Sequence, residues 1–184
     1  MVVNSILLNE IPCENFCILK LKEIRVSKGI ICMKCNSTQY YWKNDKSMFE
    51  CKICHSRKSL TSGTIMHRTK MPLHYWVVAL NQILYNNKIT VKEIQTTLNH
   101  NRYEPILDIC NTIKLQLKRL KVEVSTKSEI EISNLITVSY NDLSIHFKNS
   151  ILPCLNTDMD EKSLDEELIK LYLEWLSQEP QTYE

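Results

Sequence analysis

Two copies of the pattern Cys-x-x-Cys constrain this chain more than any other feature. They lie at Cys32/Cys35 and Cys51/Cys54, with fifteen residues between the pairs. Each pair can form a tight turn that directs both thiolates to one point, and two such turns supply a tetrahedral four-sulfur shell for Zn²⁺. The alternatives are two disulfides or four unrelated buried thiols, but paired Cys-x-x-Cys spacing is far more specific for zinc than a lone pair.

The residues between the two pairs predict a small sheet. Residues 40–42 and 48–49 are largely aromatic or apolar and read as two short strands, with a polar turn at 43–47. This segment has too few apolar residues to form a stable hydrophobic core, so its fold needs another source of stability. Bound metal can supply the folding free energy directly. We therefore expect a zinc ribbon. Because the cysteines fill all four ligand positions, we expect one structural zinc ion and no catalytic water.

Amino-acid composition indicates the cellular compartment in which this chain is expected to work. Eight cysteines without a convincing signal peptide at the start favour a reducing compartment and metal binding over disulfides. No run of about eighteen apolar residues occurs, so we expect no membrane span. Only Gly29 and Gly63 are glycines, and no glycine-rich phosphate loop is present. We expect a cytoplasmic protein.

Charge is distributed unevenly along the chain. Residues 1–124 hold 19 Lys+Arg and 9 Asp+Glu, whereas residues 125–184 hold 4 and 12. The first two-thirds is therefore a candidate polyanion binder followed by an acidic region. The acidic region could equally bind a protein partner or fold back over the basic part.

Helical periodicity surrounds the predicted ribbon. A short helix is expected over 12–27, where Cys13 and Cys17 could form a second metal pair but read better as buried or idle thiols. Three more helices are expected at 72–86, 90–98 and 104–121, the second opened by the capping box Thr90-x-x-Glu93. These three helices are joined by tight turns and form a candidate helix-turn-helix motif. A plain three-helix bundle is the competing interpretation.

Candidate DNA contacts follow from this arrangement. Arg102 and Tyr103 lie at the start of the expected recognition helix, 104–121, where side chains approach the base edges of DNA. Cations further along this helix suit contact with phosphate. Basic residues after the second cysteine pair also suit phosphate, although a solvated strand edge explains them equally well. The predicted DNA-binding set is Arg57, Lys58, Arg102, Tyr103, Lys114, Lys118, Arg119 and Lys121.

The expected fold class is α+β, in four parts. These are a helical lead-in at 1–28, the zinc ribbon at 29–66, the helix-turn-helix-like region at 67–122 and an acidic C-terminal region at 123–184. The last part should contain a β-hairpin between about 134 and 147 and an amphipathic helix around 164–175. The apolar stripe of that helix would pack on the chain's own hairpin or on a partner, including a second copy.

Seven short stretches, spread in order over about 110 residues, point to a known family. They lie at 21–25, 31–38, 41–42, 49–54, 62–66, 71–76 and 101–106. In these stretches the chain resembles the N-terminal part of bacterial insertion-sequence transposases of the ISXO/Merlin type. The resemblance implies a zinc ribbon with ligands Cys32, Cys35, Cys51 and Cys54, followed by a helical region that recognises the ends of the element. Asn36 and His55 depart from the family pattern, because such turns often have glycine or a small or basic residue there.

Beyond residue 122 the resemblance stops. The family's catalytic part is an RNase H-like domain whose acidic triad binds two metal ions. About sixty residues remain here, too few for that fold, and Asp142, Asp158, Asp160 and Asp165 do not recreate its motif. We therefore expect a zinc-dependent, nucleoid-associated protein that binds double-stranded DNA and is not an enzyme. The alternatives are the DNA-recognition subunit of a multi-chain nuclease or transposase, and a zinc-stabilised protein-interaction module.

Overall fold

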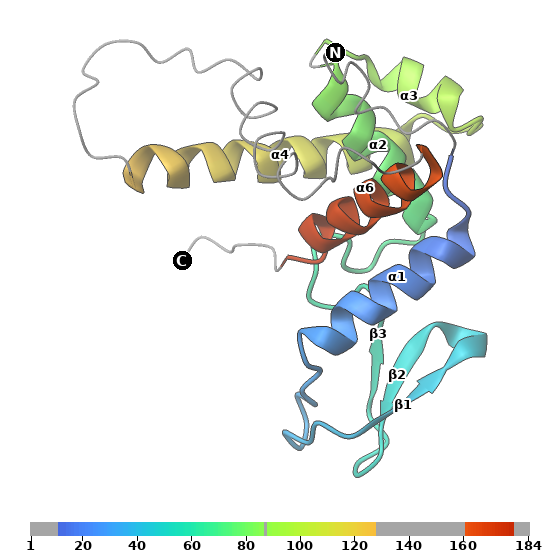
Figure 1. Ribbon diagram of the computed structural model, residues 1–184, viewed down its shortest axis with the longest axis vertical. Coiled ribbons are helices and arrows are strands. Elements are labelled where there is room, and N and C mark those ends of the chain that lie inside the picture. Colours follow the sequence, from blue (N-terminus) through green and yellow to red (C-terminus); the bar gives the residue numbers. More distant parts are fainter. Residues whose placement is uncertain (1–10, 87, 128–160, 179–184) are drawn as a thin grey trace. The chain divides into compact units, whose positions relative to one another are not determined.

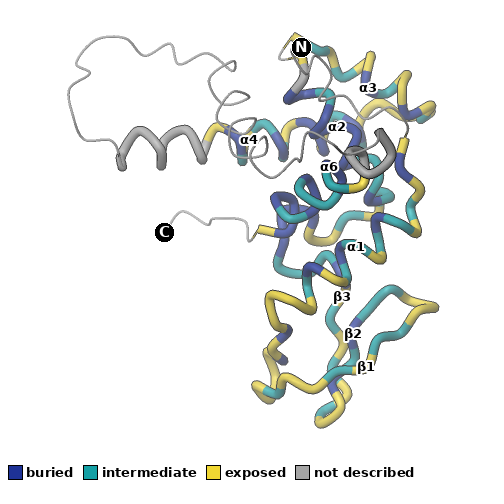
Figure 2. The backbone as a smooth tube through the Cα atoms, viewed as in Figure 1, coloured by how far each residue is buried: buried dark blue, intermediate teal, exposed yellow. Residues whose placement is uncertain are grey.

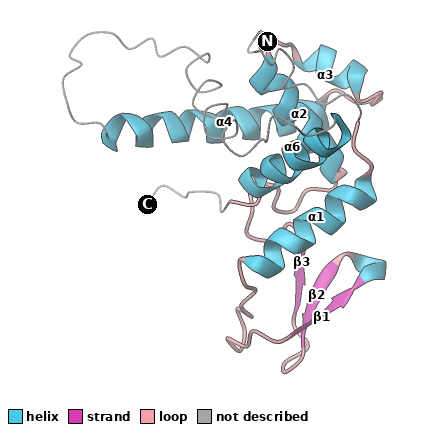
Figure 3. Ribbon diagram, in the orientation of Figure 1, coloured by secondary structure: helices cyan, strands magenta, loops and turns pink. Residues whose placement is uncertain are grey.

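A computed structural model describes residues 11–86, 88–127 and 161–178, which form an α+β structure (Figures 1 and 3). Within these ranges it contains five α-helices and one three-stranded antiparallel sheet. The elements are α1 (Glu14–Ser27), β1 (Tyr40–Lys43), the 3₁₀ helix η1 (Asn44–Lys46), β2 (Met48–Cys51), β3 (Arg57–Ser59), α2 (Leu73–Tyr85), α3 (Val91–Thr97), α4 (Glu104–Lys127) and α6 (Glu161–Leu176).

The chain divides into two compact units. The first, here called the cysteine unit, comprises Pro12–His74 and Ile169–Glu184, and the second, the helical unit, comprises Met1–Ile11 and Tyr75–Leu168. In the described part of both units, fully buried residues are concentrated in the helices, whereas the cysteine-bearing turns and the sheet are largely exposed or half-buried (Figure 2).

The sheet of the cysteine unit has the order β1-β2-β3. Tyr40 pairs with Cys51 between the first two strands, and Phe49 pairs with Lys58 between the second and third. The connection between β1 and β2 is η1, followed by Ser47 in the left-handed region at φ 44°. Both predicted strands are therefore confirmed. The basic segment after the second cysteine pair, for which a solvated strand edge was one of two interpretations, forms β3, a largely exposed edge strand that pairs with β2.

Aromatic packing gives this small sheet its core. The Phe49 ring lies 4.8 Å from the Trp42 ring and 6.2 Å from the Tyr40 ring, measured between centroids. Helix α1 lies beside the sheet (Figure 1), and its Lys22 ammonium sits 5.0 Å from the centre of the Trp42 ring. Such a cation–π contact adds a modest attraction at the helix–sheet boundary.

Helix α1 confirms the predicted lead-in helix. It buries Cys17, Leu21 and Ile24, whereas Cys13 just before it is exposed. Burial raises the pKa of the Cys17 thiol to about 12, so this side chain behaves as a small neutral hydrophobe. The interpretation of these two cysteines as buried or idle thiols agrees with this placement.

A long-range connection within the cysteine unit joins α1 to the first residues of α2. The Glu14 carboxylate accepts hydrogen bonds from the backbone N–H groups of Leu73 and His74, at 2.9 and 3.0 Å, and lies 2.9 Å from the His74 ring Nδ1. Helix α1 thereby caps the start of α2, whose first N–H groups have no partner within their own helix.

The C-terminal end of α6 also belongs to this unit. Its apolar stripe is buried within the chain, with Tyr172, Leu173 and Leu176 fully inaccessible to solvent. The Lys28 ammonium donates to the Ser177 hydroxyl at 2.7 Å, and the Ile65 N–H donates to the Gln178 carbonyl at 3.1 Å. The hairpin predicted over 134–147 lies outside the described residues.

The helical unit shows the predicted capping box. The Glu93 N–H donates to Thr90 Oγ1 at 3.3 Å, and the Thr90 N–H donates to the Glu93 carboxylate at 2.7 Å. The tight turn expected between α3 and α4 is present, with Asn99 at φ 48°. The buried side chains of α3 and α4 recur at helical spacing and comprise Ile94, Leu98, Ile106, Ile109, Cys110, Ile113 and Leu117.

Helix α4 runs past its predicted end at Lys121 to Lys127, because residues 122–127 contain no glycine or proline that would stop it. No helix in the described ranges is both long enough and apolar enough to span a bilayer.

Candidate metal centre

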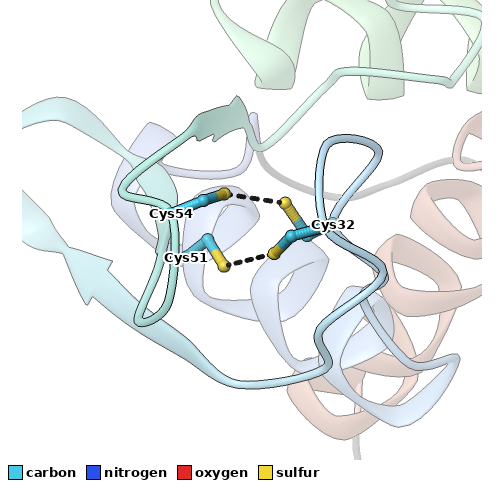
Figure 4. Close-up of side chains that lie close together, drawn as sticks. Cys32, Cys51 and Cys54 are labelled. Atoms are coloured by element: carbon cyan, nitrogen blue, oxygen red, sulfur yellow. Dashed lines mark hydrogen bonds between the residues drawn. The ribbon is translucent and has the colours of Figure 1, made fainter.

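The sulfur atoms of Cys32, Cys35, Cys51 and Cys54 lie close together. Figure 4 labels Cys32, Cys51 and Cys54 and shows their side chains turned toward one another. All four sulfur atoms lie within 4.8 Å of one another, and the Cys32–Cys54 and Cys35–Cys51 sulfur pairs are each 3.5 Å apart. In a regular tetrahedron with metal–sulfur bonds of about 2.3 Å, neighbouring sulfurs are about 3.8 Å apart. The observed spacing therefore fits one tetrahedrally coordinated ion.

Two turns of the same geometry present these sulfurs. In each, the N–H of the residue after the second cysteine donates to the carbonyl of the first, Asn36 to Cys32 at 2.8 Å and His55 to Cys51 at 3.1 Å. The first cysteine's own N–H donates to the carbonyl of the sixth residue, at 2.9 Å in both turns. Asn36 and His55 both adopt φ 55°, a left-handed conformation in which Asn and His are enriched among non-glycine residues. These two departures from the family pattern are thus compatible with the turns.

Strand pairing sets the two turns against each other. The first turn precedes β1, and the second connects β2 to β3, with Cys51 as the last residue of β2. The Lys52 N–H in the second turn donates to the Gln39 carbonyl next to β1 at 3.0 Å. The antiparallel register therefore holds both turns at the same end of the sheet.

Ser56 lies against the sulfur cluster. Its hydroxyl oxygen is 3.0 Å from the sulfur of Cys32 and 3.3 Å from that of Cys54. The Ser56 hydrogen bond, aided by the Lys34 backbone N–H, lowers the pKa of Cys32 to about 5, and Ser56 also lowers the pKa of Cys54. Sequence reasoning missed this residue, although a hydroxyl two positions after a ligand cysteine was visible in the sequence.

Cys35 has the opposite tendency. The Ser37 backbone donates a hydrogen bond that favours its thiolate, but desolvation and the three neighbouring thiols raise the pKa of Cys35 to about 12. Four thiolates at this separation repel one another strongly, so full ionisation of the cluster requires a cation among them. Soft thiolate donors in a tetrahedral set suit zinc or an iron–sulfur centre.

Elsewhere in the described part of the chain, no other group of three or more His, Cys, Asp or Glu residues converges in a way that could hold a metal ion. The four predicted ligands form the group, and Cys13 and Cys17 do not contribute to it.

The predicted DNA contacts fall on both units. Arg57 and Lys58 lie on β3 in the cysteine unit, where the Arg57 Nε donates to the Glu50 carboxylate at 2.9 Å. In the helical unit, Arg102 and Tyr103 are exposed in the turn before α4, which suits contact with a partner.

Further along α4, Lys114 is half-buried and Lys118 is exposed. Arg119 and Lys121 are on the same helix, but their side chains lie outside the described residues. Contact of any of these residues with DNA stays a prediction.

A search of protein-family models, of curated proteins and of solved structures found no match to this chain.

Proposed function

We propose that the cluster binds one structural zinc ion and that the protein binds duplex DNA without strand-transfer chemistry of its own. The observation that carries the proposal is the four-sulfur cluster within a basic unit. The cysteine unit, residues 12–74 and 169–184, holds 13 Lys+Arg and 7 Asp+Glu. A zinc ion with four thiolates carries a formal charge of about −2, so the unit stays positive after the metal binds. A positive surface of this kind attracts the phosphate backbone.

Zinc is preferred to iron for a chemical reason. The ion has no redox chemistry and readily takes a closed tetrahedral set of four cysteines in small ribbon-like units. The sheet here buries few side chains, with only Phe49 and Cys51 fully buried among its strand residues. A metal that serves mainly to stabilise the fold therefore suits this site.

The helical unit supports the DNA-binding part of the proposal. Helices α3 and α4 are joined by a short turn, and the residues immediately before α4 are exposed. We interpret α4 as a recognition helix whose first turn, with Arg102 and Tyr103, approaches base edges. The resemblance to the N-terminal part of ISXO/Merlin-type transposases supports the same interpretation.

Fluorescence anisotropy on labelled duplex DNA, with the zinc-loaded full chain in 50–200 mM salt, tests this function. We expect binding that weakens steeply as salt rises, because each contacted phosphate releases counterions. Arg102→Ala should weaken binding by about 1–3 kcal/mol if it contacts a base. Lys88→Ala removes an exposed cation between α2 and α3 and serves as the matched control. Absence of binding at 50 mM salt by folded, zinc-loaded protein refutes the proposal.

One observation favours a second candidate, a zinc-stabilised protein-interaction module. Three apolar side chains around the metal-binding turns are strongly exposed, namely Ile31 at 55%, Met33 at 88% and Ile53 at 63%. Contiguous exposed apolar surface often marks protein contacts, and these three side chains lie in or next to the two turns whose sulfurs meet. If the zinc-loaded wild-type chain shows no salt-dependent DNA binding, that result would favour this module over the DNA-binding function.

A further inference from the structure

An open cavity of about 360 Å³ lies in the cysteine unit, next to the metal-binding turns. Its lining consists of Met33, Lys34, Tyr40, Ser56, Arg57, Lys58 and Ser62. Three of these side chains are cationic, three carry hydroxyls and none is a carboxylate. Every lining residue belongs to the segment Pro12–His74, so one unit alone forms the cavity.

We propose that this cavity binds a phosphate group, supplied by the DNA backbone. The choice of DNA as the source rests on the proposed function, whereas the affinity for phosphate follows from the lining itself. Arginine offers a planar fork of N–H donors to phosphate oxygens, lysine offers a point charge, and hydroxyls complete the hydrogen bonding. The volume is at the lower end of the range of about 300–1,000 Å³ for ligand pockets, which suits a small anionic group.

The arginine in the lining is held in position. Arg57 lies directly opposite Glu50 in the β2–β3 ladder, and its Nε donates to the Glu50 carboxylate at 2.9 Å. Lys43 also approaches Glu50, at 3.7 Å, so this carboxylate is shared between two cations. A guanidinium has four N–H donors besides Nε, and these remain suited to a phosphate.

The metal centre and the cavity share a wall. The Ser56 hydroxyl that lines the cavity lies 3.0 Å from the Cys32 sulfur, and Lys34 is inside the first cysteine turn. At the other side, the carbonyl of Ser62 accepts a hydrogen bond from Arg25 Nη2 at 2.8 Å. Bound metal would therefore fix the turn that presents Lys34 and the position of Ser56, which lies between the sulfur cluster and the cavity.

Charge balance of the metal centre is a competing explanation for the cations. A zinc tetrathiolate carries about −2, which nearby lysines and arginines would offset without any ligand. The unit's excess of cations is larger than this, with 13 Lys+Arg against 7 Asp+Glu over residues 12–74 and 169–184. The surplus leaves a positive field at the cavity, where an anion would be drawn in.

The test compares the zinc-loaded full chain with the Lys34→Gln/Lys58→Gln double variant. Lys46→Gln is the matched control, because this exposed cation of η1 lies in the same unit but outside the lining. Anisotropy over a salt series gives DNA affinity and its salt slope, and ¹⁵N NMR follows backbone amides during separate titrations with duplex DNA and inorganic phosphate. Zinc content and amide dispersion verify folding of each variant. If the double variant is misfolded, Lys34→Gln alone, at an exposed position, replaces it.

We expect the double variant to bind DNA about tenfold more weakly at 0.1 M salt, with the slope of log K against log salt reduced by about 1. The control should match the wild type, and the amides of Lys34, Ser56 and Ser62 should shift with DNA.

Other results separate the two claims. Unchanged slope and affinity in the double variant overturn the phosphate site but leave DNA binding standing. If DNA does not bind yet inorganic phosphate shifts the cavity amides in the wild type and not in the double variant, the phosphate site stands and the DNA-binding function fails. No response to either titrant overturns both.

Discussion

Removal of the metal should unfold the sheet and both cysteine turns while leaving α2, α3 and α4 folded. A native segment of about 30 residues, such as 30–60, has a stability of roughly 1.5–5 kcal/mol by the usual 0.05–0.15 kcal/mol per residue. Structural zinc contributes about 10–16 kcal/mol in small zinc-binding units at pH 7. The free energy lost with the ion is therefore larger than the whole free energy of unfolding of the segment.

The core of the sheet cannot compensate for this loss. Among residues of β1, β2 and β3, only Phe49 and Cys51 are fully buried. Burying one phenylalanine contributes about 1.5–3 kcal/mol, which is several-fold less than the metal. The helical unit has its own stripe of buried isoleucines and leucines in α3 and α4, and no cysteine of the cluster belongs to it.

Native mass spectrometry before and after chelation should show loss of one zinc ion. In ¹⁵N NMR, the amides of β1–β3 should then move to unstructured shifts and lose protection from hydrogen exchange, while those of α4 keep theirs. Cys51→Ala should reproduce this result without a chelator. Cys13→Ala should not, because that exposed cysteine lies in the same unit but outside the cluster. Dispersed, protected β-strand amides in verified metal-free protein would refute the reasoning.

Three further predictions concern single side chains. Ser56→Ala removes the hydroxyl whose contact is the main cause of the lowered pKa of Cys32 and which contributes to the lowered pKa of Cys54. More protons then compete with zinc at a given pH, so the pH midpoint of zinc binding should rise, as followed by a zinc-indicator titration between pH 5 and 8. Glu14→Ala removes the cap on α2 and should lower the free energy of unfolding in urea by about 2 kcal/mol. The control Glu23→Ala, at an exposed acidic residue of α1, should change that free energy by under about 0.5 kcal/mol. Equal effects of the two substitutions would count against the cap. Thr90→Ala should destabilise α3 by about 1 kcal/mol, read from hydrogen exchange. Thr96→Ala on the same helix provides the control, since its hydroxyl donates to the Lys92 carbonyl of that helix and caps no helix end.

Local features of this protein were predictable because neighbours in sequence determine them. Both β-strands around the 43–47 turn, the capping box at Thr90 and the start of α4 at Glu104 depend on contacts a few residues apart. The four ligand cysteines belong to the same class, since the Cys-x-x-Cys turn is formed by backbone hydrogen bonds within six residues. The spacing of these cysteines alone predicted that their sulfurs would meet, and they do.

What the tertiary structure decided involves partners far apart in the chain. Glu14 caps a helix that begins 59 residues later, and Lys28 meets a hydroxyl 149 residues away, at the end of α6. Neither contact has a sequence signature, because a carboxylate or lysine on a helix surface is usually solvated. The cavity beside the metal centre also needed the fold, since strand register brings Tyr40, Arg57 and Lys58 together with the first cysteine turn. Spacing in the sequence thus identified the ligands, whereas the packing of distant segments created the surroundings in which they act.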